Sequence, residues 1–176
     1  MEASNLTALI ILVTGIAGII LIKAVGSFLK AQAKKTEQVI DDIIISSIGK
    51  PLMLFLVIIT IYFSLATSTL IPVEYAWILD SKYLMVCITI LATWIVWSFV
   101  KKVATQYEEH ILESSSHETG IWLYHFFRST FSYIIWIIAG IVILNILEVD
   151  ITPLMAAGGI VGIAAGFAGK DILGNF

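Results

Sequence analysis

Long apolar stretches alternate with short charged clusters along this chain of 176 residues. Five of the stretches approach the roughly 20 residues that an α-helix needs to cross the hydrocarbon core of a membrane. They cover approximately residues 5–29, 50–71, 83–100, 128–147 and 153–175. Gly49 and Pro51 open the second stretch, and Pro72 closes it. The pattern predicts an all-α, polytopic membrane protein with five transmembrane helices.

The distribution of basic residues predicts the orientation, because lysine and arginine stay on the cytoplasmic side of membrane proteins. With the N-terminus outside, Lys82 is the one basic residue on the outer side, and nine of the ten lie inside. These nine are Lys23, Lys30, Lys34, Lys35, Lys50, Lys101, Lys102, Arg128 and Lys170. We therefore predict a multi-pass protein of the cell (inner) membrane with an outer N-terminus and a cytoplasmic C-terminus.

The two inner loops mix charged residues with sparse apolar positions, so we expect helical extensions within residues 30–42 and 101–120. His110, Glu113 and His117 have the spacing with which three side chains can bind a metal on one helix face. A solvated polar face explains the same residues, and the three serines at 114–116 favour a loop there. No metal site is expected.

Composition excludes several classes of function. Hydrophobic residues make up 59% of the chain, which is more apolar surface than a soluble domain of this length can bury. The net charge of -3 gives no reason to expect a nucleic-acid partner. The sequence contains no phosphate-binding glycine loop, no zinc-binding cysteine pairs and no nucleophile elbow. We expect neither an enzyme nor a cofactor.

Small residues form two stripes along the last apolar stretch, which begins with a potential cap at Thr152 and with Pro153 in the first turn. Small residues drive helix association in membranes, so two stripes predict two neighbours, as in a ring of identical helices. One stripe contains Gly158, Gly162, Ala165, Gly166 and Gly169, and the other contains Ala157, Ala164 and Ala168.

A row of mostly larger residues lies between the two stripes and consists of Ala156, Ile160, Ile163, Phe167 and Lys170. In a ring that packs through glycine and alanine, this row faces the axis and lines a pore. Rings of Ile163 and Phe167 form a narrow apolar throat, and such a throat can gate by dewetting. The alternative from spacing alone is a tightly packed central helix in a transporter or scaffold.

This last stretch resembles the pore-lining helix of the small-conductance mechanosensitive channel family. It carries the family's G-x-x-G-x-A-x-G run at Gly159, Gly162, Ala164 and Gly166, followed by a polar turn and an asparagine in GKDILGN. The resemblance covers about residues 150–176. The four preceding spans agree in topology, with two helices ahead of the family's usual three. The family's two constriction residues, four positions apart, fall on Ile163 and Phe167.

The resemblance implies an ion channel that opens under membrane tension during osmotic stress. Residues 1–147 would form peripheral, lipid-facing sensor helices, and residues 148–176 would form the pore-lining helix of a homo-oligomer like the family's heptamer. Lys170 and Asp171 carry charges that nearly cancel, so a weakly selective pore is expected. The expected partners are membrane lipids, further copies of the chain and permeating ions. The alternative is a non-conducting membrane scaffold or regulatory subunit that packs through its glycine-rich helix.

Two features depart from the family pattern. The glycine at which the family kinks its pore helix aligns with Asp171, so the bend is expected at Gly169 or Gly174 instead. Family members also continue into a cytoplasmic β-rich layer and an α/β cage, and the sequence carries neither of these domains. We therefore expect either an isolated membrane domain or a natural truncation.

Overall fold

The computed structural model describes residues 2–33, 39–69, 71–114 and 118–174. These residues form five α-helices and one 3-10 helix, with no strand among them. The all-α class predicted from the sequence is confirmed. The helices are α1 (Glu2–Ala33), α2 (Val39–Thr67), η1 (Val73–Leu79), α3 (Ser81–Ser114), α4 (Glu118–Ile146) and α5 (Thr152–Gly174).

Five stretches of the described chain are long and apolar enough to cross a membrane, which confirms the predicted number of spans. They are Ser4–Phe28, Ile43–Thr67, Glu74–Gln106, Tyr124–Ile146 and Thr152–Lys170.

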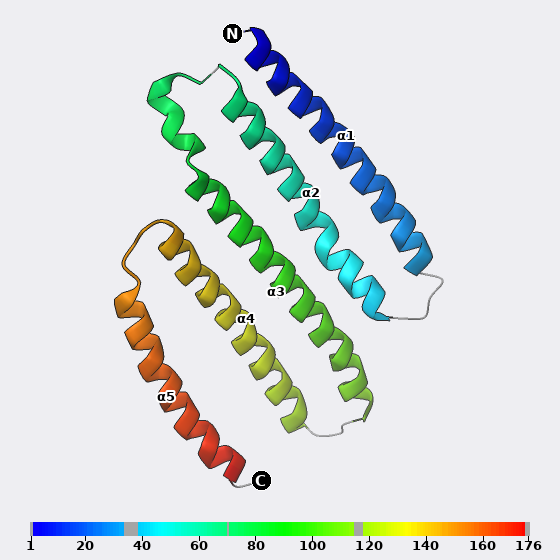
Figure 1. Ribbon diagram of the computed structural model, residues 1–176. Helices are drawn as coiled ribbons and strands as arrows, with labels where there is room; N and C mark the ends of the chain where they lie inside the picture. Colours follow the sequence, from blue (N-terminus) through cyan, green and yellow to red (C-terminus); the bar gives the residue numbers. More distant parts are fainter. Residues whose placement is uncertain (1, 34–38, 70, 115–117, 175–176) are drawn as a thin grey trace.

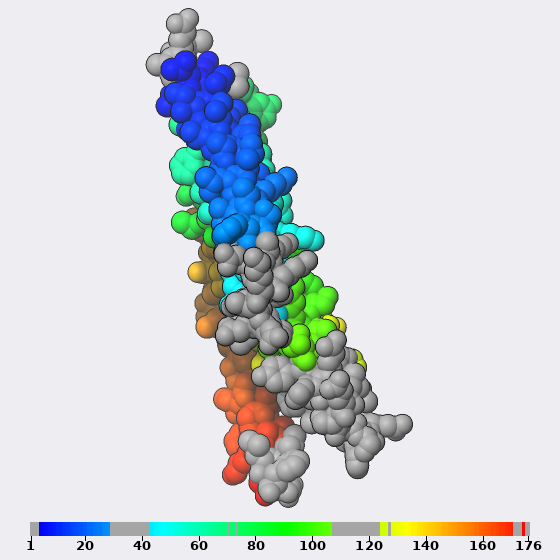
Figure 2. Space-filling view, turned by 90° about the vertical axis from the view of Figure 1, so that its right-hand side faces the viewer, coloured from blue at the N-terminus to red at the C-terminus, as the bar shows by residue number. Residues whose placement is uncertain are grey.

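The first four long helices form a row in which each helix packs against the next one along the chain: α1 against α2, α2 against α3, and α3 against α4. Successive helices run in opposite directions, so the two termini lie at opposite ends of the molecule (Figure 1). From the α1 side the molecule is long and narrow, and α5 extends past α1 at the C-terminal end (Figure 2). A row of this kind has no central core, and its helices offer two broad faces to surrounding lipid.

The row begins with α1 and α2, which approach each other closely. Ser64 donates a hydrogen bond to the carbonyl oxygen of Ala8 at 3.2 Å, and both residues are buried. At the end of α2, the Asn5 side-chain oxygen accepts bonds from the Thr69 backbone N–H at 3.2 Å and from its hydroxyl at 3.0 Å. Because lipid offers little hydrophobic driving force between helices, such small contacts and polar bonds hold the pair together.

Gly15 permits this approach, and we expect Gly15→Ala to destabilise the α1–α2 pair. A Cβ atom at this position would lie 2.8 Å from the Cβ of Thr60, inside the range that real contacts allow. Overpacking of this kind costs about 1–3 kcal/mol. Thermal unfolding of the detergent-solubilised protein should therefore show a lower midpoint. Gly18→Ala is the matched control, because its Cβ would meet the nearest Leu56 atom at an ordinary 3.5 Å; equal midpoints for the two variants would contradict the close-approach argument.

Polar bonds also join the later helices of the row. The Tyr62 hydroxyl donates to the carbonyl oxygen of Leu79 at 2.9 Å, which ties α2 to η1. The indole N–H of Trp97 on α3 donates to the Ser132 hydroxyl on α4 at 2.6 Å. These bonds link α2 to η1 and α3 to α4, which are neighbours along the chain.

The second span begins earlier than the sequence predicted. We expected it to start near Lys50 because of Gly49 and Pro51, but α2 continues through Pro51 and its candidate span begins at Ile43. Proline removes one backbone bond, here the one to the carbonyl of Ser47, and membrane helices tolerate that loss where neighbouring groups compensate. Apolar residues at 43–45 and 48 extend the apolar run on the other side of the proline.

The third and fourth helices are likewise longer than their predicted spans. The expected helical extensions are confirmed where the structure describes them, since α3 continues to Ser114 and α4 begins at Glu118. The candidate metal ligands His110 and Glu113 have side chains outside the described set, and His117 lies outside the described residues. Among the described residues, no group of three potential ligands gathers for a metal ion.

Candidate functional site

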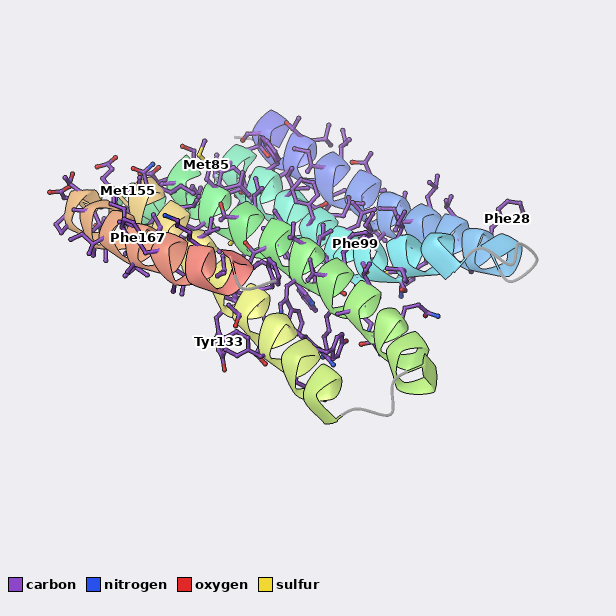
Figure 3. The ribbon with its side chains drawn as sticks, turned by 90° about the horizontal axis from the view of Figure 1, so that it is seen from below. Phe28, Met85, Phe99, Tyr133, Met155 and Phe167 are labelled. Atoms are coloured by element: carbon purple, nitrogen blue, oxygen red, sulfur yellow. The ribbon has the colours of Figure 1, made fainter. Side chains whose placement is uncertain are left out.

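The last helix, α5, stands apart from the row. None of its described side chains is buried, and the other described helices do not pack against it as the first four pack against one another. Figure 3 places Met155 and Phe167 on α5 at one side of the row and Phe28 on α1 at the other. An apolar helix without partners in its own chain must cover its surface with lipid or with other chains.

The predicted pore-lining row lies on this uncovered helix. Ile160, Ile163 and Phe167 are 70%, 64% and 67% exposed, and Ala156 and Lys170 are exposed as well. A helix turns by about 100° per residue, so these five positions fall within one face of α5. The structure of the single chain brings them to one face and leaves that face open.

The small-residue stripes are equally open. A Cβ atom built at Gly158, Gly162, Gly166 or Gly169 would meet no heavy atom within 4 Å. Glycine in a helix interior costs about 1 kcal/mol relative to alanine, and no contact from the described residues offsets that cost. Ala164, Ala165 and Ala168 are exposed beside these glycines. The stripes therefore remain available for contacts between chains.

The C-terminal end of α5 is a continuous helix. The helix runs through Gly169 as far as Gly174, so it has no break at Gly169. The chain beyond Gly174 lies outside the described residues, and the bend expected there stays a prediction. Lys170 is exposed near this end, while the side chain of Asp171 is outside the described set and Asn175 lies outside the described residues.

A tightly bonded corner joins α4 to α5. The Val149 N–H bonds to the carbonyl of Leu144 at 3.0 Å, and the Glu148 N–H bonds to the carbonyl of Asn145 at 3.0 Å. This pair of bonds is the Schellman motif, which usually places glycine in its left-handed position. Here Glu148 occupies that position with a φ of 62°. The helix thus ends in a defined geometry at a conformational cost.

Asp150 caps the start of α5, whereas the sequence pointed to Thr152. Its carboxylate accepts a bond from the Thr152 backbone N–H at 2.9 Å, and Thr152 is already the first helical residue. Bonds from the Thr152 hydroxyl and backbone lower the pKa of the Asp150 carboxyl. The cap therefore stabilises the helix start above the ordinary pKa of aspartate and is lost as the pH falls through the lowered value.

The strained residue of the corner gives a direct prediction. We expect Glu148→Gly to be about 1 kcal/mol more stable than Glu148→Ala, because only glycine adopts a positive φ without a Cβ clash. Both substitutions remove the same charge, so the comparison isolates the backbone. Thermal unfolding in detergent measures the difference. An alanine variant as stable as the glycine variant would show that position 148 is not held in the left-handed conformation.

Sequence reasoning did not find the corner. Asp150 ahead of Pro153 is a recognisable signal of a helix start, and this signal predicts the cap. The left-handed Glu148 carries no such signal, since glycine or asparagine is the usual residue there.

The fold and the open helix define a class: a polytopic helical membrane protein whose final glycine-rich helix is available to other chains. Residues 129–170 match the family described as mechanosensitive ion channel, transmembrane helices 2/3. The match spans most of α4 and α5, which therefore correspond to those two helices. Together with the five apolar helices, it fits the transmembrane domain of a small-conductance type mechanosensitive channel and confirms the resemblance found in the sequence. Comparisons with curated proteins and with solved structures gave no significant match.

Proposed function

We propose that this protein is an ion channel opened by membrane tension, in which several copies form a ring and α5 of each copy lines the pore. The observation that carries the proposal is the isolation of α5: it exposes two small-residue stripes and an apolar row, and no described part of its own chain covers them. A ring uses all three surfaces, because the stripes contact two neighbours and the row faces the axis. The family's heptamer is the expected assembly.

The constriction in this proposal is formed by Ile163 and Phe167, with Ala156 and Ile160 toward the outer mouth and Lys170 at the inner mouth. Apolar rings of this kind resist water entry without a plug. Lys170 and Asp171 from every subunit nearly cancel in charge, so the inner mouth selects weakly between cations and anions.

Tension acts on the proposed channel through the row α1–α4, whose broad faces contact lipid. Tension favours the state with the larger in-plane area, and only a difference in lipid contact between the closed and open states biases the gate. The family match covers α4 and α5. It supports a division of the chain into sensor helices and a pore-lining helix, since the first three helices precede the matched region.

The proposed orientation places the N-terminus outside. The last turns of α1, α3 and α5 and the first turns of α2 and α4 lie at one end of the molecule (Figure 1). The basic residues of these five helices, apart from Lys82, lie in the helix halves toward that end. Lys82 lies at the start of α3, at the opposite end.

Cysteine labelling tests this orientation. Cys87 is the single cysteine of the sequence and is replaced first by serine. In this Cys87→Ser background, an impermeant thiol reagent applied to intact cells should label Lys82→Cys and not Lys101→Cys. Permeabilised cells, in which both positions should react, provide the control for accessibility. Labelling of Lys101→Cys alone in intact cells would reverse the assignment.

Single-channel recording in liposomes under suction tests the function. Purified protein should give conductance steps whose open probability rises with suction, with currents of similar size for cations and anions. An assembled, correctly inserted ring that stays silent up to the rupture tension of the liposome would refute the channel proposal. That result would favour the alternative of a scaffold or regulatory subunit.

A further inference from the structure

A second feature of the row is a pocket of about 710 Å³ between α1, α2 and α3, close to the connection between α1 and α2. Apolar side chains form most of its wall, so the pocket offers a surface on which a hydrocarbon chain can lie. They include Leu21, Ile22, Val25, Ile44, Ile48 and Leu52.

Three lysines from three different helices line the same pocket: Lys23 of α1, Lys50 of α2 and Lys102 of α3. The Lys102 ammonium donates a hydrogen bond to the Ser46 hydroxyl at 2.6 Å, and Ser46 is also one of the lining residues. Among the described residues, none of the lining side chains is acidic. Asp41 and Asp42 precede the lining part of α2, and their side chains are outside the described set. The pocket therefore combines an apolar wall with a concentration of positive charge.

The three lysines lie near span ends, where their ammonium groups can reach the headgroup region of a bilayer. Each lies four to seven residues inside the nearest end of its candidate span, which corresponds to roughly 6–10 Å along the helix axis. Lysine side chains at this depth extend toward the interface and place their ammonium groups near the lipid phosphates. Three like charges around one pocket repel one another unless an anion neutralises them.

We propose that this pocket binds an anionic phospholipid, with its phosphate among Lys23, Lys50 and Lys102 and an acyl chain along the apolar wall. Basic pockets between transmembrane helices on the cytoplasmic side are suited to such headgroups. A zwitterionic lipid carries its own positive group and matches the three lysines less well. The proposal rests on the orientation proposed above, with this end of the helices on the cytoplasmic side, and it stands independently of channel activity.

Native mass spectrometry of the protein tests the proposal, with phosphatidylglycerol or phosphatidylcholine added to the detergent. We expect preferential retention of phosphatidylglycerol. Each of Lys23→Gln, Lys50→Gln and Lys102→Gln should weaken its binding roughly five-fold, since one lysine near an anionic lipid contributes about 1 kcal/mol. The triple glutamine variant should lose the preference. A triple arginine variant, which keeps the charge, should retain it and shows that substitution alone does not disrupt the pocket.

Lys101→Gln is the matched control. It removes the same charge from the neighbouring position, but the Lys101 ammonium lies over the Trp97 ring at 5.0 Å, and Lys101 does not line the pocket. We expect it to retain phosphatidylglycerol like the unaltered protein. Equal binding of both lipids, an unchanged preference in the triple glutamine variant, or an equal loss in Lys101→Gln would overturn the proposal. Displacement of the lipid by millimolar inorganic phosphate would also overturn it, because the site would then recognise a free anion.

Discussion

Ile163→Ser is expected to make the protein leak ions without applied tension and to open at lower suction than the unaltered channel. Keeping one isoleucine side chain out of water contributes about 2 kcal/mol, and in a ring the contribution repeats in every subunit. A serine hydroxyl forms hydrogen bonds with water, so the throat fills at a smaller diameter. Phe167→Ser should act in the same direction. The measurement is patch recording of liposomes at matched protein amounts, with resting current and opening tension as the readouts.

Val161→Ser is the control for this experiment. Val161 is as exposed as Ile163 in the single chain, at 66% against 64%. It lies about 160° away around the helix, between the two small-residue stripes. We therefore expect an opening tension close to that of the unaltered protein. If Val161→Ser leaks as strongly as Ile163→Ser, or if neither serine variant on the large-residue row changes the tension, another face of α5 lines the pore.

Gly162→Leu and Gly166→Leu should each dissociate most of the assembly. A leucine in the stripe prevents the close approach of neighbouring α5 helices, and overpacking costs about 1–3 kcal/mol at each interface of the ring. The expected result is a shift from oligomer to monomer in native mass spectra. The single chain itself should keep its fold, because nothing in the described structure lies within 4 Å of a Cβ at either glycine.

Gly140→Leu provides the comparison for assembly. Gly140 on α4 also has no heavy atom within 4 Å of a Cβ built there, but it lies outside the two stripes of α5. We expect it to remain oligomeric. Should the unaltered protein prove monomeric, or should both α5 variants assemble normally, the ring proposal fails regardless of the family match.

The sequence predicted the features that depend on local pattern. The five apolar stretches became five helices, and the helical spacing that places Ile163 above Phe167 holds in a continuous α5. Local rules misplaced the start of α2, because Pro51 and Gly49 end helices in water but are tolerated in a membrane helix. The helices α3 and α4 also extend beyond their apolar stretches, because charged residues at the membrane surface do not end a helix.

Features that depend on contacts between distant residues were beyond the sequence. The sequence predicted only that Lys23, Lys50 and Lys102 lie on the inner side, and the packing of α1, α2 and α3 brings them around one pocket. The fit of Gly15 against Thr60 required the same knowledge of which helix faces which. For α5 the limit is different, since the partners that we propose for this helix are other copies of the chain.

The bonded corner between α4 and α5 acts as a stiff elbow. Leu147 to Ile151 connects two helix ends that are both fixed, one by the Schellman bonds and the other by Asp150. In the proposed channel, a tilt of α4 would therefore be transmitted to α5 and not absorbed by a flexible connection. Phe167 lies about 22 Å along α5 from the elbow, so a swing of about 5° moves it by about 2 Å. In the proposed ring, opposite side chains would separate by about 4 Å, more than the ~2.8 Å diameter of a water molecule.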